Sequence, residues 1–340
     1  MRGAELAVIV LLSTAAAASA QTAQPSGDRL APGDREIAIE FGGRHRIALV
    51  HLPPAAAGDA PLPVLFAFHG GGGNAEAHRA WTDLDATADR AEILVLYPEG
   101  SGRYFERKLL TWNAGACCGY AARESVDDVG ASLALLEELA RRTPVDATRV
   151  YASGLSNGSM MAFRLGHDAG DRIAGIATVA GVALPTPFAP RRPMPIIHFH
   201  SVDDPRALYA GGLGPLLPFL TRVFHPPVED TLHTWARFDG CPDEARVVER
   251  RSGRAGSGDA SHTATLLVYD RCASGAEVEL WKLTGAGHVW PGAGPRYSER
   301  LLGPPTQVID ANELLWRFLS RFRRSDAPAL PRPLHAMTPG

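Results

Sequence analysis

The sequence lacks the charge and hydrophobicity features that mark several large classes of protein. Its 340 residues carry a formal net charge of only −3 and show neither a basic stripe nor an acidic tail, so nucleic acid is not an expected partner. Beyond residues 1–20, no stretch is long and apolar enough to span a bilayer of roughly 30 Å, and no internal repeat is visible. The composition is 45% hydrophobic and 21% charged, which is ordinary for a globular protein with one large core.

Cysteine is also scarce. The four residues are Cys117, Cys118, Cys241 and Cys272, and no pair has the C-x-x-C spacing of a zinc or thioredoxin site. A bridge between Cys241 and Cys272, which lie in loop-like contexts, would close a loop of about 30 residues and stabilise the fold by roughly 3–4 kcal/mol. For the adjacent Cys117 and Cys118, a vicinal disulfide and a buried free thiol both stay open.

The first 20 residues have the pattern of a secretion signal. Arg2 supplies a positive start, residues 7–12 are apolar, and Ala18-Ser19-Ala20 fits the small-x-small cleavage rule. The apolar run is too short for the alternative, a membrane anchor. We therefore expect residues 1–20 to be a signal peptide, a mature chain from Gln21 with no membrane contact, and a secreted or periplasmic protein in an oxidising compartment.

The remaining chain alternates short apolar runs with longer helical stretches. Residues 21–35 are predicted to be a loose leader, and residues 36–52 a hairpin that turns at Gly42-Gly43. Strands are then expected at 64–68, 93–97, 150–153 and 196–200, with helices at 75–90, 126–142 and 157–167. Short apolar strands separated by helices predict an α/β fold with a mostly parallel central sheet flanked by helices.

The last third adds strands at 265–269 and 278–283 and an amphipathic helix at 308–322, followed by a predicted disordered tail at 324–340. Residues 36–323 are therefore expected to form a single catalytic domain. The Pro-rich segment 213–227 is either a lid or cleft wall, or an ordered loop.

The segment Gly154-Leu155-Ser156-Asn157-Gly158 matches the G-x-S-x-G pattern of a nucleophile elbow. A predicted strand precedes it and a predicted helix follows, which is the context that the elbow requires. Small residues flank the serine because the turn is tight, and the helix N-terminus favours developing negative charge. An ordinary glycine-rich turn is the alternative to Ser156 as a nucleophile.

The segment His69-Gly70-Gly71-Gly72-Gly73 follows another predicted strand. Loops of this type direct a backbone N–H toward the oxyanion of an acyl-transfer reaction, and glycine allows the backbone to come close. We assign the two oxyanion donors to the N–H groups of Gly71 and Asn157. The alternative is a flexible loop without function.

The general base and its acidic partner are expected late in the chain, in the order Ser, Asp, His. His288 follows the strand predicted at 278–283, whereas His198 and His200 lie within a strand and are expected to pack or bond in the core. Asp203 and Asp204 follow the strand predicted at 196–200, and we prefer Asp204 as the acid that orients His288.

Six segments together resemble the secreted polyhydroxybutyrate-depolymerase-like esterases, which include feruloyl and acetyl-xylan esterases. They are HGGGGN (69–74), TWNAGACCG (111–119), VDDV (126–129), GLSNGSMMA (154–162), DPRALYAGG (204–212) and GAGHVWPG (285–292). The resemblance spans about residues 36–320 and implies the α/β-hydrolase fold. The family's acid segment reads like HGTAD, and its fifth place here is Asp204, although the departures at 201–203 leave Asp203 open.

The resemblance also implies a Cys241–Cys272 bridge and places Trp112, Asn113 and Trp290 near a substrate cleft. The alternative for the two tryptophans is a place in the core. The implied reaction is hydrolysis of carboxylic esters by Ser156, His288 and Asp204, with no metal or cofactor.

Expected substrates are small or oligomeric esters, of the polyhydroxybutyrate type or feruloyl and acetyl esters of plant polysaccharide. The chain has no segment that resembles a polymer-binding module, which favours soluble esters. Other classes remain open: a non-catalytic binding protein on the same scaffold, or a serine peptidase or acyltransferase with the same triad. The sequence implies no particular oligomeric state.

Overall fold

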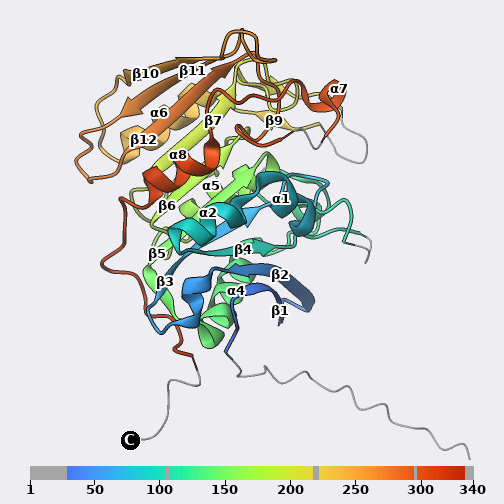
Figure 1. The fold of residues 1–340 in the computed structure, drawn as a ribbon, viewed down its shortest axis with the longest axis vertical. Helices are drawn as coiled ribbons and strands as arrows, with labels where there is room; N and C mark the ends of the chain where they lie inside the picture. The colour runs from blue at the N-terminus through green and yellow to red at the C-terminus, as the bar shows by residue number, and fades with distance from the viewer. Residues whose placement is uncertain (1–28, 104–106, 116, 217–221, 295–296, 334–340) are drawn as a thin grey trace, which may run out of the picture.

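A large twisted sheet with helices on both faces organises the chain in the computed structural model, which describes residues 29–103, 107–115, 117–216, 222–294 and 297–333 (Figure 1). The predicted signal peptide and residues 21–28 of the leader lie outside the described residues. In the described part, ten strands follow one another in the sheet in the order β1-β2-β4-β3-β5-β6-β7-β12-β11-β10. No helix there is both long and apolar enough to cross a bilayer.

The middle of the sheet is parallel and its two ends are antiparallel. The parallel strands are β4 (Leu94–Pro98), β3 (Leu62–Phe68), β5 (Val145–Leu155), β6 (Gly175–Val179), β7 (Ile196–Ser201) and β12 (Val278–Thr284). Antiparallel pairing adds β1 (Gly33–Phe41) and β2 (Arg44–Leu52) at one end, and β11 (Thr263–Tyr269) and β10 (Arg246–Ser252) at the other. This arrangement confirms the predicted fold class.

Two helical layers cover the sheet. One face packs against α4 (Asp128–Arg142), α5 (Asn157–Asp168) and α6 (Val228–Phe238), and the other against α1 (Ala75–Thr82), α2 (Leu84–Ala91) and α8 (Ala311–Leu319). The second layer faces the viewer in Figure 1. The central strands are covered on both sides, which is why β3 is buried at every position and reads as a continuous apolar run.

Several short elements complete the described part of the fold. They are the helices α3 (Gly119–Arg123) and α7 (Glu299–Leu302), the single-turn helix Pro54–Ala57, and a two-stranded ladder of β8 (Gly212–Leu213) and β9 (Phe224–His225). The ladder occupies the Pro-rich segment that was expected to be a lid, a cleft wall or a loop. Residues 217–221 of that segment lie outside the described part.

Some predicted boundaries were wrong. The helix expected at 75–90 is two helices, because Asp83 adopts a left-handed conformation at φ 52° and ends α1. The described part of the expected loose leader, residues 29–35, is attached to the domain, since buried Leu30 donates its N–H to Arg142 O (3.0 Å) and β1 begins at Gly33. The expected disordered tail is likewise attached over 324–333, where the Arg324 N–H donates to the Thr148 carbonyl (2.8 Å).

Both cysteine pairs are disulfides in the structure. Cys241 follows α6 and is bridged to Cys272, which follows β11, as the family resemblance implied. Cys117 and Cys118 are bridged to each other, so neither is a free thiol.

A buried histidine in α1 makes the fold sensitive to acid. The His78 ring packs edge-on against Trp290 (5.7 Å between centroids), and neither ring nitrogen has a hydrogen-bond partner among the described residues. Burial lowers the pKa of His78 to about 3. The unfolded chain, with the ordinary pKa of about 6.5, binds the proton more readily, so His78 reduces stability as the pH falls below that value.

We therefore expect His78→Leu to flatten the acid side of the stability profile. The slope of the unfolding free energy between pH 6 and 4 should fall by up to about 1.4 kcal/mol per pH unit, the contribution of one titrating group. Urea unfolding at each pH measures it. The exposed His45→Leu is the control for loss of a surface histidine; an unchanged slope in His78→Leu would show that His78 is charged in the folded protein.

Candidate active site

The predicted nucleophile lies in a sharp turn between β5 and α5. Ser156 has φ 58° and ψ −121°, which for a residue with a side chain costs roughly 1–3 kcal/mol. The surrounding backbone holds it there, because its N–H donates to Val179 O (2.8 Å) and its carbonyl accepts from Met160 N (3.0 Å). This conformation is that of a nucleophile elbow, so the G-x-S-x-G interpretation describes the local backbone correctly.

The two glycines of the elbow are required by close packing. A Cβ on Gly158 would overlap the carbonyl oxygens of Phe68 and His69, at the end of β3. A Cβ on Gly154 would overlap the carbonyl group of Gly158 itself. The strand before the serine, the helix after it and the end of β3 therefore meet at backbone contact distance.

The glycine loop after β3 does not use all of its N–H groups within the described residues. Gly72 N donates to Leu110 O (2.8 Å) and Gly73 N donates to Gly70 O (3.0 Å), whereas no described residue accepts a hydrogen bond from Gly71 N. Asn157 N lies in the first turn of α5, where an α-helix has no acceptor of its own. These are the two N–H groups that the sequence suggested as oxyanion donors.

His69 fixes the glycine loop in place. Its Nδ1 lies 2.8 Å from Gly70 O, and its Nε2 lies 3.0 Å from the N–H of Gly100, after β4. A ring that donates through Nδ1 and accepts through Nε2 is neutral, and burial accordingly lowers the pKa of His69 to about 4. The sequence offered no specific role for His69 beyond its place in the motif.

Trp112 joins the two halves of the predicted oxyanion site. The Asn157 side chain accepts from Trp112 N (2.7 Å) and donates to Trp112 O (3.1 Å), while the Trp112 indole donates to His69 O (2.9 Å). The indole is fully buried, edge-on to the Phe68 ring. The expectation that Trp112 contacts substrate is therefore corrected: the side chain is part of the scaffold.

The other two predicted substrate contacts are scaffold as well. Trp290 is 1% exposed and donates its indole N–H to Asn312 Oδ1 (2.9 Å). Asn113 is buried, and its side chain donates to Val126 O (2.9 Å) and accepts from Gly115 N (3.2 Å). The sequence pattern located these residues beside the site without showing which way they point.

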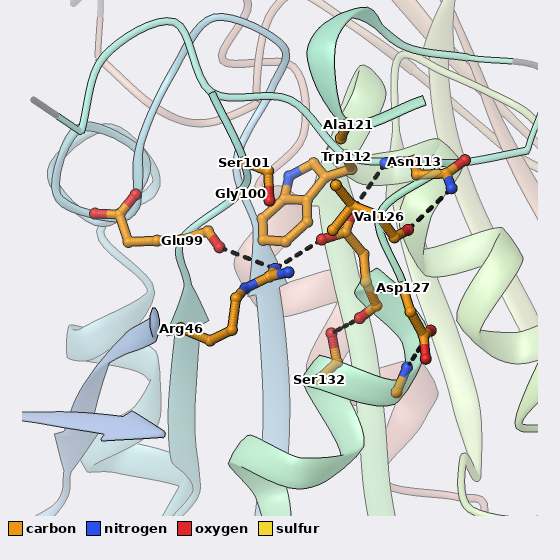
Figure 2. Close-up of polar contacts among 12 residues, drawn as sticks. Arg46, Glu99, Gly100, Ser101, Trp112, Asn113, Ala121, Val126, Asp127 and Ser132 are labelled. Atoms are coloured by element: carbon orange, nitrogen blue, oxygen red, sulfur yellow. Dashed lines mark hydrogen bonds and ion pairs between the residues drawn. The ribbon is translucent and has the colours of Figure 1, made fainter. Parts of the chain in front are cut away.

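A buried ion pair supports the Trp112 segment from below, as Figure 2 shows. The Arg46 guanidinium donates to Asp128 Oδ1 (2.7 Å), and Asp128 Oδ2 accepts the Asn113 backbone N–H (2.8 Å). Burial raises the pKa of Asp128, against the opposing effect of Arg46. Asp127, beside it, caps α4 by accepting from Gly130 N (2.8 Å).

The predicted base and acid are in contact. His288 Nδ1 lies 2.7 Å from Asp204 Oδ2, while Asp204 Oδ1 accepts from the N–H groups of Arg206 (2.7 Å) and Ala207 (2.9 Å). Burial alone would raise the pKa of Asp204, but His288 and His200 hold it well below its ordinary value. Asp204 is therefore a carboxylate that can accept a hydrogen bond from Nδ1–H of His288.

Asp203 contacts the loop that carries His288. Its carboxylate is exposed and accepts from Gly285 N (2.7 Å), at the start of the loop that carries His288. The loop is fixed again where His288 N donates to Leu302 O (2.6 Å). Of the two aspartates, Asp204 thus contacts the His288 ring, and Asp203 contacts the backbone of the loop that carries it.

Comparisons with known proteins bear on this site. The model of the family described as "Esterase PHB depolymerase" matches residues 47–213. NocK of Nocardia uniformis subsp. tsuyamanensis, named as a candidate esterase, is 29% identical over 94% of this chain and 98% of its own length. The chain is a carboxylic ester hydrolase that is similar to this family over the matched region. The matched region contains the HGGGG and G-x-S-x-G segments of this chain.

Two further relatives of this esterase are informative. Feruloyl esterase B of Piromyces equi is 26% identical over 72% of this chain but only 42% of its own length, so the chain matches less than half of that protein. Among solved structures, sOPH in its native form has a TM-score of 0.52 at 15% identity, over 92% of this chain and 94% of that one. At that identity the likeness concerns the α/β-hydrolase fold alone.

We expect loss of the buried cation to be far more harmful than loss of the whole pair. Arg46→Met leaves Asp128 charged and unpaired in the core and should destabilise the fold by about 3–5 kcal/mol, measured by urea unfolding. The double variant Arg46→Met/Asp128→Leu removes both charges and should recover part of that loss. Equal destabilisation by the single and the double variant would mean that the two charges are not coupled.

Proposed function

We propose that this esterase cleaves its substrate through an acyl-enzyme on Ser156, with His288 as general base and Asp204 as the acid that orients it. The observation that carries the proposal is the 2.7 Å contact between Asp204 Oδ2 and His288 Nδ1. Ser156, Asp204 and His288 follow β5, β7 and β12, which are parallel, so all three lie at the carboxyl edge of the sheet. Active sites of open α/β sheets occur at this edge.

The reaction proceeds in two acyl transfers. His288 Nε2 takes the proton of the Ser156 hydroxyl as its oxygen attacks the ester carbonyl, and the N–H groups of Gly71 and Asn157 donate to the oxyanion that forms. The bond to the alcohol oxygen then breaks, and His288 returns the proton to that oxygen. Water, deprotonated by His288, cleaves the acyl-enzyme and releases the acid.

The substrate class rests on the relatives and on the surface beside His288. A feruloyl esterase and an acetylxylan esterase/xylanase are among the relatives, and the matching family model is that of a polyester depolymerase. The apolar side chains of Val202 and Leu301 are exposed next to the segments that hold Asp204 and His288. These features favour soluble hydroxyalkanoate oligoesters, or feruloyl and acetyl esters of plant polysaccharide, met by an exported enzyme.

A rate screen tests the nucleophile and the substrate together. Purified mature protein is compared on p-nitrophenyl butyrate, methyl ferulate, acetylated xylan and soluble 3-hydroxybutyrate oligomers. We expect Ser156→Ala to lower kcat by about 10⁴-fold or more on every ester, with the fold intact by circular dichroism. Near-wild-type hydrolysis by Ser156→Ala would reject Ser156, and faster cleavage of peptide anilides than of aryl esters would favour a peptidase.

The two neighbouring aspartates offer a matched pair of variants. Asp204→Asn removes the charge that faces His288 and should lower kcat by about 10³- to 10⁴-fold on p-nitrophenyl butyrate. Asp203→Asn, one residue away and exposed, should keep most of the activity because its amide oxygen still accepts from Gly285 N. The reverse order of the two losses would assign the acid to Asp203.

A further inference from the structure

A line of buried polar side chains runs beneath Asp204, through β6 and β7. Thr178 Oγ1 lies 2.8 Å from His198 Nδ1, and His198 Nε2 lies 3.0 Å from His200 Nδ1. His200 Nε2 in turn lies 2.8 Å from Ala207 O and 3.5 Å from Asp204 Oδ2. All three side chains are buried, and the two histidines share one face of β7 because they are two residues apart.

The direction of each hydrogen bond follows from the far end of the line. Ala207 O is a carbonyl and can only accept, so the Nε2 of His200 carries a proton. In a neutral ring the Nδ1 of His200 then accepts, which requires His198 to donate through Nε2 and to accept through Nδ1. The Thr178 hydroxyl, which lies 2.8 Å from His198 Nδ1 and 3.4 Å from Ile197 O, is then the donor to the nearer His198. Burial holds the pKa of His198 far below its ordinary value, which keeps that ring neutral.

Ala207 also closes the turn that carries Asp204. Ala207 donates its N–H to Asp204 Oδ1 (2.9 Å) and accepts from His200 through its carbonyl. Asp204 Oδ1 has two backbone donors, and Oδ2 faces both His288 and His200. Three donors therefore hold the carboxylate while His200 Nε2 faces its Oδ2, and rotation of the carboxylate would break several contacts.

Other titratable groups also face His200. The Tyr209 ring lies edge-on to it at 5.6 Å, and His225 of β9 interacts electrostatically with His200, His288 and Asp204. Burial lowers the pKa of His225 to about 4, so this ring adds no positive charge at neutral pH. His200 and His288 are therefore the imidazoles that directly face the Asp204 carboxylate.

We propose that His200 is a positioning residue for the reaction, whose Nε2–H is directed by His198 and Thr178 toward Ala207 O and Asp204 Oδ2. This inference rests on the proposed role of Asp204 and His288. The line sets the tautomer of His200, His200 fixes the 204–207 turn, and the turn fixes the carboxylate oxygen that receives the His288 Nδ1–H. The orientation of His288 thereby depends on side chains of β6 and β7, in the middle of the sheet.

Two variants of His200, one without an N–H donor and one with it, test the proposed role. His200→Leu lacks the Nε2–H, and we expect kcat on p-nitrophenyl butyrate to fall by about 10-fold or more while KM changes little. Without that donor, Asp204 attracts the His288 proton more strongly, so the acid limb of the kcat/KM profile should move to higher pH. His200→Gln keeps an N–H donor near the same place and should restore most of both properties.

If His200→Leu folds poorly, a substitution of Thr178, at the other end of the line, is a milder test. Thr178→Val has nearly the same shape but no hydroxyl, and it should lower kcat about 2- to 5-fold in the same direction on the pH axis. Thr178→Ser keeps the hydroxyl and should behave as the wild type. Kinetics and pH profiles of His200→Leu and Thr178→Val that both equal those of the wild type would overturn the proposal.

A measurement independent of activity fixes the tautomers. In ¹⁵N-histidine-labelled protein, His198 and His200 should both be neutral rings protonated on Nε2, whereas His69 should be neutral and protonated on Nδ1, as an internal reference. A proton on Nδ1 of His200 would contradict the line. Ser156→Ala, run beside these variants, separates the two proposals: if it abolishes hydrolysis while His200→Leu does not impair it, the triad stands and the role of His200 falls.

Discussion

The contact between Gly158 and the carbonyl end of β3 is the constraint on which the active site depends. Because no side chain separates them, α5 begins directly against Phe68 and His69, and Ser156 is forced into its positive-φ turn. The same approach places the glycine loop next to the serine. The ends of β3 and β5, about 90 residues apart in the chain, thereby bring the proposed nucleophile and the expected oxyanion donors together.

Buried polar side chains then hold in place the backbone segments that the glycines allow to approach one another. His69 holds the glycine loop, Asn157 and Trp112 hold each other, and the Arg46–Asp128 pair holds the segment after Trp112. Each of these groups is buried and bonded, as a polar group in a core must be if it is not to destabilise the fold. The site is therefore surrounded by side chains that only position others, which is why aromatic residues close to it in sequence are not substrate contacts.

The sequence predicted the parts of this molecule that depend on local chemistry. Apolar runs located β3, β4, β7 and β12, since strands buried on both faces must be continuously apolar. Glycine patterns located the elbow, because only glycine fits where three backbones meet. The resemblance to a known family supplied the Cys241–Cys272 bridge, which spacing alone left open.

What the sequence did not predict depends on tertiary contacts. The strand β6 is short and rich in small residues, and β10 is an exposed edge with arginines, so neither has the pattern of a buried strand. The ion pair of Arg46 with Asp128 joins residues 82 positions apart, and no local pattern links them. The orientation of Trp112 and Trp290 is likewise set by partners distant in sequence, whereas the split at Asp83 reflects a single backbone conformation that aspartate tolerates.

The first and last described segments are attached to the domain close to each other, near the end of α4 and the start of β5. Leu30 is attached to Arg142, at the end of α4, and Arg324 is attached to Thr148, early in β5. Both anchor points precede the long run of β5 toward Ser156, so they belong to the amino edge of the parallel strands, and the candidate site belongs to the carboxyl edge. Contacts made beside these anchor points would thus leave the edge that carries the candidate site exposed on the opposite side of the sheet.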